Sequence, residues 1–233
     1  MPVPYAGNYF YPPRTEIRVP YTSAVVGMWK KHSDSIAQWK MNGTNTQVKV
    51  TPQGKIELWT RHRFDEFGRE APSGTPQMVK DGKTTLYSLP KAMQEEILDL
   101  TPRGVYTIYN AELMHSRTTQ VKDVLYFFDV LVWKGMHLLG VSYKDRHSIN
   151  VEIFGKRNFD LDSATIKGKI YVAENMAANL WDAAWAKAQS CKFCEGLVLK
   201  RTGAVSVLTN GDRLLNNGGF LCRIRKPTKN ARY

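Results

Sequence analysis

Cysteine and long apolar runs are both scarce in this sequence. The 233 residues include three cysteines, an odd and small number that argues against a disulfide framework and suits a reducing compartment. No apolar run approaches the roughly 20 residues of a membrane-spanning helix. Residues 1–5 (MPVPY) lack the basic start and apolar core of a secretory signal. We therefore predict a soluble, cytoplasmic protein with no membrane partner.

Acidic residues are the second shortage. Asp and Glu number 21 against 33 Lys and Arg, which gives a net charge of +12. Fixed positive charge releases counterions from a phosphate backbone and steers encounter with it, so the expected partner is nucleic acid. The alternative is that this charge only keeps the protein soluble.

The sequence also lacks the ligand spacing of a structural zinc site. Cys191 and Cys194 form a single C-x-x-C, Cys222 lies far along the chain, and the five histidines show no metal-binding spacing. We predict that the cysteines are small core residues. Repeats and low-complexity linkers are missing too, and the length fits one domain spanning residues 1–233.

Strand-forming patterns are abundant by contrast. Alternating or β-branched runs predict strands at residues 47–51, 56–60, 104–113, 125–133, 195–201, 205–208 and 220–225. Turns are predicted at 52–55, 134–135 and 216–219, and helices at 89–100 and 174–189. The apolar helix faces are predicted from Ala92, Ile97, Leu98 and Leu100, and from Leu180, Ala184 and Ala188. The pattern predicts an α+β fold of mostly antiparallel sheets with flanking helices.

Four short stretches carry chemically useful groups in a fixed order. They are KMNG from Lys40, NAELM around Glu112, CEGLVLK ending at Lys200 and CRIRKP ending at Pro227. Each alone is common, but in this order they resemble the covalent nucleotidyltransferase superfamily of ATP-dependent DNA and RNA ligases and mRNA capping enzymes. The resemblance begins near Gln38 and implies a nucleotidyltransferase domain, the ATP-grasp-like adenylation domain of ligases.

The resemblance also implies roles for particular residues. Lys40 matches the nucleophile of the K-x-D-G motif, with Asn42 in place of Asp, and would take AMP from ATP as a phosphoramidate. Phe128 would stack on the purine, and Arg61 would contact the nucleotide or a polynucleotide end. The other implied nucleotide contacts are Gln38, Asn42, Gly43, Glu112, Glu195, Lys200, Arg223, Arg225 and Lys226. Glu112 and Glu195 are the implied Mg²⁺ ligands, and Arg146 falls where relatives often carry Glu-Arg.

The residues suit this chemistry independently of the family. A free lysine has a pKa near 10.4, so only about one in 10³ molecules carries the nucleophilic amine at neutral pH. Burial and nearby cations lower such a pKa. Carboxylates such as Glu112 and Glu195 are the oxygen ligands that Mg²⁺ prefers. Asn42 and Gly43 permit a tight turn that presents Lys40 at the end of a strand.

Two departures from the family pattern bear on the substrate. The usual K-x-K of the fifth motif is replaced by Arg223-Ile224-Arg225-Lys226, and the pattern alone leaves its register open. No OB-fold is expected, because few residues follow this motif. Phage-like RNA ligases form the enzyme adenylate without that domain and often read K-x-x-G-T-N, which Asn45 completes. We therefore rank RNA ligase ahead of DNA ligase.

The compact format also resembles phage and viral enzymes, so the intracellular location includes a phage- or virus-infected host. We expect a monomer. Two other classes stay open, a GTP-dependent capping-type guanylyltransferase and a nucleic-acid-binding module without catalytic activity.

Overall fold

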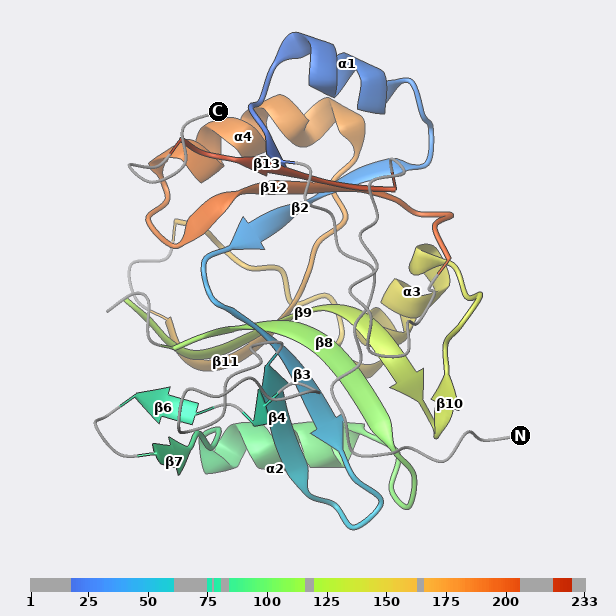
Figure 1. Cartoon of the computed structure of the whole chain (residues 1–233), viewed down its shortest axis with the longest axis vertical. Coiled ribbons are helices and arrows are strands. Elements are labelled where there is room, and N and C mark those ends of the chain that lie inside the picture. The colour runs from blue at the N-terminus through green and yellow to red at the C-terminus, as the bar shows by residue number, and fades with distance from the viewer. Residues whose placement is uncertain are drawn as a thin grey trace.

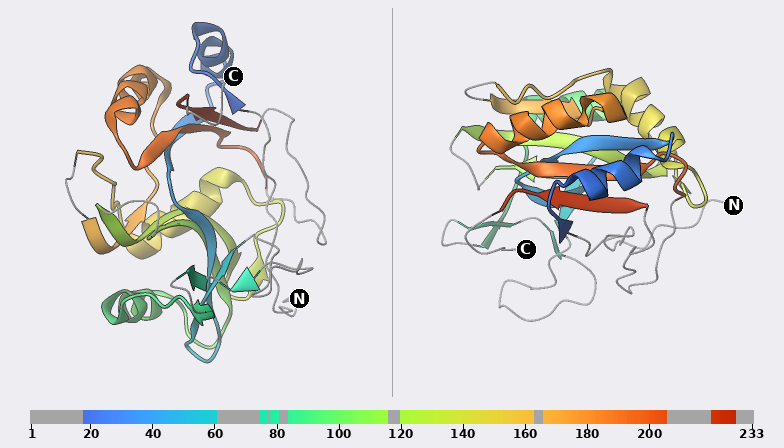
Figure 2. Two further views of the ribbon diagram at one scale, coloured as in Figure 1. Left: turned by 60° about the vertical axis from the view of Figure 1, so that its left-hand side comes forward. Right: turned by 90° about the horizontal axis from the view of Figure 1, so that it is seen from above.

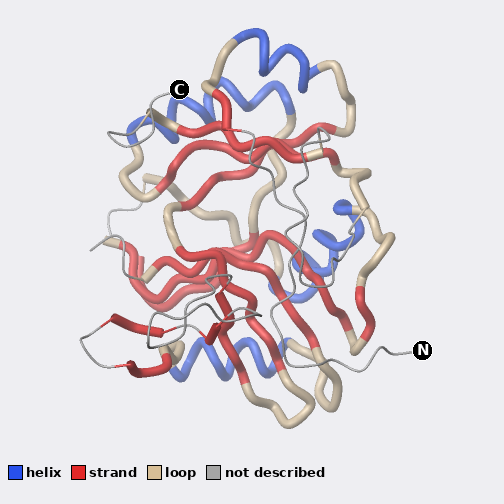
Figure 3. Tube along the Cα trace, in the orientation of Figure 1, coloured by secondary structure: helices blue, strands red, loops and turns tan. Residues whose placement is uncertain are grey.

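The computed structural model describes residues 18–60, 75–76, 78–80, 84–115, 120–162, 166–205 and 220–227. The implied contact Arg61, the turn predicted at 216–219 and most of the strand predicted at 205–208 lie outside these residues. Two β-sheets dominate the described part, and helices pack against both of them (Figures 1 and 3).

The first sheet carries most of the motif residues. Its strands, in spatial order, are β1 (Arg18–Val19), β13 (Leu221–Arg225), β12 (Cys194–Arg201) and β2 (Ser35–Met41). β1 runs parallel to β13, and the other pairs are antiparallel. The helices α1 (Ser23–Lys30) and α4 (Trp181–Ser190) lie on its outer side (Figure 2). A 3₁₀ turn, η1 (Ala178–Leu180), leads into α4.

The second sheet has seven strands. The main order is β10 (Met136–His137), β9 (Val121–Trp133), β8 (Thr107–Met114), β3 (Thr44–Val50), β4 (Ile56–Thr60) and β5 (Thr75–Pro76). β11 (Ile166–Val172) pairs in parallel with β9. The helices beside this sheet are α2 (Lys91–Leu100) and α3 (Tyr143–Phe154), and a small hairpin joins β6 (Met78–Lys80) to β7 (Thr84–Leu86).

Strand alternation builds two separate cores. On β2, Ala37, Trp39 and Met41 are buried, and they belong to a cluster that includes Trp181 and Ala184 of α4. A second cluster lies on one face of the seven-stranded sheet and joins it to α2 and α3. Its members include Val48, Tyr109, Phe127, Ile97 and Phe154. The first cluster also includes Met114, Val124 and Tyr126 of the second sheet, so this core joins the two sheets to each other as well as to α4.

The predicted fold class is confirmed, while some element details are wrong. The predicted helices exist but begin later, at Lys91 and, after η1, at Trp181. The predicted strand at 104–113 begins at Thr107 because residues 104–106 form a turn and bend. The helices α1 and α3 and the strand β11 were not predicted. No described helix is long and apolar enough to cross a membrane.

The predicted helix faces are only partly correct. Ile97, Ala184 and Ala188 are buried as predicted, and Leu98 is partly buried in the second core. Ala92, Leu100 and Leu180 are exposed instead. Met93 and Trp181 occupy the buried positions instead, because Met93 lies four residues before Ile97 and Trp181 three residues before Ala184, which places each pair on one helix face.

Candidate active site

One face of the first sheet gathers five of the motif residues. Lys40 of β2 and Arg225 of β13 both pair with Gly196 of β12. Gln38 and Arg223 likewise share one partner residue, two positions further along β12. Residues paired across strands point to the same side of a sheet. The side chains on the face away from α1 and α4 therefore include Gln38, Lys40, Lys200, Arg223 and Arg225.

Glu195 reaches this face through a β-bulge. The register between β12 and β2 shifts between Cys194 and Gly196, so Glu195 is the extra residue of the bulge. Its Oε2 forms ion pairs with Lys40 Nζ and, at 3.0 Å, with Arg225 Nη2. The three side chains are 15–21% exposed. The bulge therefore places the Glu195 carboxylate where it pairs with both Lys40, the candidate nucleophile, and Arg225.

The backbone at the bulge requires glycine. Gly196 has a φ of +139°, and a Cβ built there would lie 2.1 Å from the carbonyl oxygen of Ile224. A side chain at position 196 would force β12 and β13 apart. The E-G pair of the motif is thus a carboxylate followed by the residue that lets its bulge form.

Glu112 ties the turn after Lys40 to the second sheet. The backbone N–H of Gly43 donates to Glu112 Oε1 at 3.1 Å, and the N–H of Asn42 donates to the carbonyl of Phe193 at 2.9 Å. A Cβ at Gly43 would lie 2.5 Å from the carbonyl oxygen of Leu113 and 2.8 Å from Glu112 Cγ. Gly43 is therefore required by close approach between β2–β3 and β8.

Phe128 also sits at a bulge. Along β8 and β9 the pairing passes from Ala111–Phe127 to Asn110–Asp129, which leaves Phe128 as the extra residue. Its half-buried ring lies 5.1 Å from Lys200 Nζ. The ammonium of Lys200, on the first sheet, therefore approaches an aromatic residue of the second sheet.

Lys200 lies in a cationic and aromatic environment. Its Nζ lies 4.2 Å from the centre of the Tyr143 ring. Burial lowers the pKa of Lys200 to about 7, the nearby Arg146 lowers it further, and Asp129 opposes both effects. Lys200 therefore changes charge near neutral pH.

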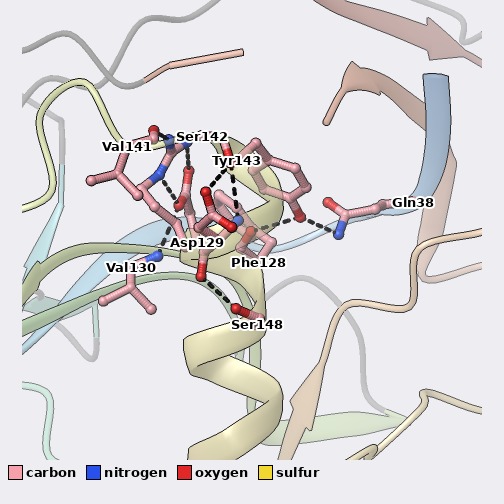
Figure 4. Close-up of polar contacts among 10 residues, drawn as sticks. Gln38, Phe128, Asp129, Val130, Val141, Ser142, Tyr143 and Ser148 are labelled. Atoms are coloured by element: carbon pink, nitrogen blue, oxygen red, sulfur yellow. Dashed lines mark hydrogen bonds and ion pairs between the residues drawn. The ribbon is translucent and has the colours of Figure 1, made fainter. Parts of the chain in front are cut away.

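Arg146 supports the strand that carries Phe128. Its Nε and Nη2 donate to the two carboxylate oxygens of Asp129 at 2.8 and 3.0 Å, and its Nη1 donates to the carbonyl of Val141 at 2.5 Å. Figure 4 labels the residues that accept these bonds, Asp129 on β9 and Val141 before α3. Arg146 is 6% exposed. Its described contacts are with protein groups and hold the residue that follows Phe128.

Tyr143 connects the two sheets. Its hydroxyl donates to the carbonyl of Phe128 at 3.1 Å and accepts from Gln38 Nε2 at 2.6 Å (Figure 4). Gln38 Nε2 also donates to Asn175 Oδ1 at 2.8 Å. Tyr143, Asp129 and Asn175 were not among the site residues predicted from the sequence. Asp129 could have been predicted, because it directly follows Phe128, which the resemblance had assigned to the site.

Another lysine with a lowered pKa, which was not predicted from the sequence, lies on β3. Lys49 is fully buried, and its Nζ lies 3.9 Å from the centre of the Trp59 ring. Burial lowers its pKa to about 7, against the opposing charge of Glu57. The other polar residues of the alternating run that begins at Gln47 are buried as well. The alternation predicted a strand, but it did not predict that the polar side chains would be buried.

Lys226 has a different placement from the two arginines before it. Its Nζ donates to the carbonyls of Ala188 and Cys191 at 2.8 and 2.6 Å, at the C-terminal end of α4. Its backbone N–H donates to the carbonyl of Glu195 at 2.9 Å. Arg223 and Arg225 are therefore the members of the last basic motif that share a sheet face with Lys40.

The carboxylates suit a magnesium ion held jointly with phosphate. Glu112 belongs to the second sheet and Glu195 to the first. No group of three or more His, Cys, Asp or Glu side chains gathers within the described ranges. Mg²⁺ is commonly held by one or two carboxylates, substrate phosphates and water, so the donor chemistry fits this ion.

Solved ligase structures share this architecture. The ligase domain of Mycobacterium tuberculosis LigD matches with a TM-score of 0.50 and 18% identity, over 84% of this chain and 55% of that one. A mycobacterial DNA ligase D in complex with ATP and MES matches with a TM-score of 0.52 and 16% identity, over 90% and 59%. The chain thus has the α+β fold of ligase nucleotidyltransferase domains and spans little more than half of each matched chain. No protein-family model and no curated protein matches the sequence.

Proposed function

We propose that this protein is an ATP-dependent polynucleotide ligase that forms a covalent lysyl-AMP on Lys40. The observation that carries the proposal is the position of Lys40, which shares the carboxylate of Glu195 with Arg225 at a β-bulge. A ligase fold supports it, because the same side-chain order is expected of an adenylation domain.

In the first step, the amine of Lys40 attacks the α-phosphorus of ATP. A P–N bond forms, the bond to the bridging oxygen breaks, pyrophosphate leaves with that electron pair, and the nitrogen releases one proton to the solvent. Arg223 and Arg225 balance phosphate charge from the neighbouring strand, and Phe128 provides a face for the purine. Glu112 and Glu195 would hold Mg²⁺, which supplies charge neutralisation at the phosphates.

In the next two steps, the AMP moves from Lys40 to a 5′-phosphate, and a 3′-hydroxyl then displaces it. The net charge of +12 suits the holding of both polynucleotide ends through their phosphates. We propose RNA ends as the preferred substrate, because Asn45 completes K-x-x-G-T-N where DNA ligases often carry arginine. Asn45 Nδ2 donates to Asn110 Oδ1 at 3.3 Å, beside Glu112.

The second candidate is a nick-sealing DNA ligase, which the two matched structures favour. We further propose that the protein acts inside the cell as a single domain and a monomer. This includes the cell of a phage- or virus-infected host. Arg61 lies outside the described residues, and we propose it as a further nucleotide contact from its position in the sequence.

Radiolabelled nucleotide tests the reaction class directly. Incubation with ATP labelled at the α-phosphate should leave label on the protein, and GTP labelled in the same way should not. Label from GTP alone would make the protein a capping-type guanylyltransferase. Label from neither nucleotide would contradict the proposal and leave a nucleic-acid-binding module. Sealing of a pre-adenylylated strand on matched RNA and DNA duplexes then separates the two ligase candidates.

A further inference from the structure

We propose that His147 acts through Asn175 to set the hydrogen-bonding character of Gln38, and thereby the purine that the site accepts. The inference rests on the proposed nucleotidyl transfer and adds a positioning residue to it. His147 lies on α3 and is 8% exposed. It is connected to Gln38 by a continuous series of hydrogen bonds.

The direction of each hydrogen bond follows from a backbone carbonyl. The carbonyl oxygen of Ala173 can only accept, and it lies 2.6 Å from His147 Nε2, so that nitrogen carries the proton. Nδ1 of the neutral ring is then an acceptor, and Asn175 Nδ2 donates to it at 3.2 Å. This turns Asn175 Oδ1 toward Gln38, where it accepts from Nε2 at 2.8 Å.

The same reasoning shows which hydrogen-bonding atom of the Gln38 amide can still bind a ligand. Its Nε2 carries two N–H groups, and they point to Asn175 and to the Tyr143 hydroxyl, which lies 2.6 Å away. Tyr143 uses its own proton on the carbonyl of Phe128. The remaining capacity of the Gln38 amide is its carbonyl oxygen, which only accepts.

Gln38 is placed to contact the edge of a base. It shares a sheet face with Lys40, two residues further along β2. Its partner Tyr143 also bonds the backbone of Phe128, the residue proposed to stack on the purine. Adenine presents an amino donor at N6 and guanine presents an acceptor at O6. An acceptor at Gln38 therefore favours adenine and disfavours guanine.

Protonation of His147 would reverse the series. With both ring nitrogens carrying protons, Nδ1 needs an acceptor, so Asn175 must present Oδ1 to it and Nδ2 to Gln38. Gln38 must then turn its own oxygen toward Asn175 and the Tyr143 hydroxyl, and its amino group toward the base. The Tyr143 hydroxyl must at the same time move its proton from the Phe128 carbonyl to that oxygen. That arrangement suits the O6 of guanine.

The surroundings of His147 set the pH at which this happens. Burial lowers its pKa, Lys200 lowers it further, and the carbonyl of Ala173 and the charge of Asp129 oppose them. The charged and titratable groups facing the ring are Lys200 from β12, Asp129 from β9, and Tyr143 and Arg146 from α3. The ring is therefore neutral at neutral pH, and the preference for adenine should weaken as the solution becomes acidic.

Equilibrium binding tests the inference without catalysis. Calorimetry on the intact protein would compare α,β-methylene analogues of ATP and GTP from about pH 5 to about pH 8. The ratio of GTP to ATP analogue dissociation constants should fall by about tenfold toward acid. His147→Phe and Asn175→Leu should make that ratio independent of pH, whereas the exposed-residue control His32→Phe should leave the parent's pH dependence intact.

The outcomes separate this inference from the proposed function. Binding of neither analogue would defeat the proposed function itself. Binding with a ratio that does not change with pH, or that still changes in folded His147→Phe, would defeat the relay alone. Should the variants fail to fold, ¹⁵N NMR of the parent decides, because a neutral His147 with its proton on Nδ1 would overturn the donor order.

Discussion

At the scale of single residues, Lys40 offers the most direct test of the chemistry. Lys40→Ala should abolish label transfer from ATP, and Lys40→Arg should be equally inactive, since a guanidinium does not lose its proton to become a nucleophile. The control is Lys55→Ala, which removes an exposed lysine in the turn between β3 and β4 and should keep parental labelling. Covalent label on Lys40→Ala, measured on a denaturing gel, would assign the nucleophile elsewhere.

The residue scale also shows what a sequence pattern can identify. Lys40, Glu112 and Glu195 are recognisable because short motifs carry them in a fixed order. Tyr143 and Asn175 are not, because they contact Gln38 from positions 105 and 137 residues away along the chain. Their role depends on contacts that α3 and the segment after β11 make with β2. A local sequence pattern does not predict such long-range contacts.

At the scale of elements, alternation along β13 assigns different roles to neighbouring basic residues. Arg225→Met should reduce label transfer by about 100-fold, since it removes a cation beside the phosphates. Lys226→Met should keep most of the labelling but lower the free energy of unfolding by about 1 kcal/mol, because the C-terminal carbonyls of α4 lose their cation.

Labelling assays and urea denaturation on the same two proteins measure both effects. The reverse assignment, with labelling lost in Lys226→Met and retained in Arg225→Met, would move the phosphate contact to Lys226. Circular dichroism of each variant provides the check that the fold is kept.

Elements were predictable where burial is apolar and periodic. The hairpin of β3 and β4 and the long strand β9 follow alternating or β-branched runs. Helix α3 was missed because its buried residues are mostly polar or aromatic, namely Tyr143, Arg146, His147, Asn150 and Phe154. Such a helix is stabilised by hydrogen bonds and ion pairs between elements, which apolar periodicity does not report.

At the scale of the whole molecule, the positive charge of +12 should make sealing sensitive to salt. The rate of joining a pre-adenylylated strand should fall steeply as salt rises, because each phosphate contact releases counterions. Label transfer from ATP should fall less, because the nucleotide carries fewer phosphates. A salt series with both assays measures the two slopes. Equal slopes, or sealing that requires an added clamp protein, would contradict a self-sufficient single domain.

The two lysines with lowered pKa values have a consequence for proton linkage and stability. The pKa values of Lys49 and Lys200 are lowered to about 7, while an unfolded lysine titrates near 10.5. Between these values the unfolded chain binds more protons than the folded one, so stability rises with pH. The tyrosines and cysteines titrate higher and act in the opposite direction, so the rise should be visible from about pH 7 to about pH 9.

Urea midpoints should therefore increase over this range, by on the order of 1–2 kcal/mol in unfolding free energy. Lys49→Met and Lys200→Met should each flatten the increase, and Lys55→Met, at an exposed turn, should not. A parent protein whose stability falls over that range would mean that both ammonium groups keep their charge in the folded state. With both lysines titrating near neutral pH, the protein should resist unfolding best in mildly alkaline rather than neutral solution.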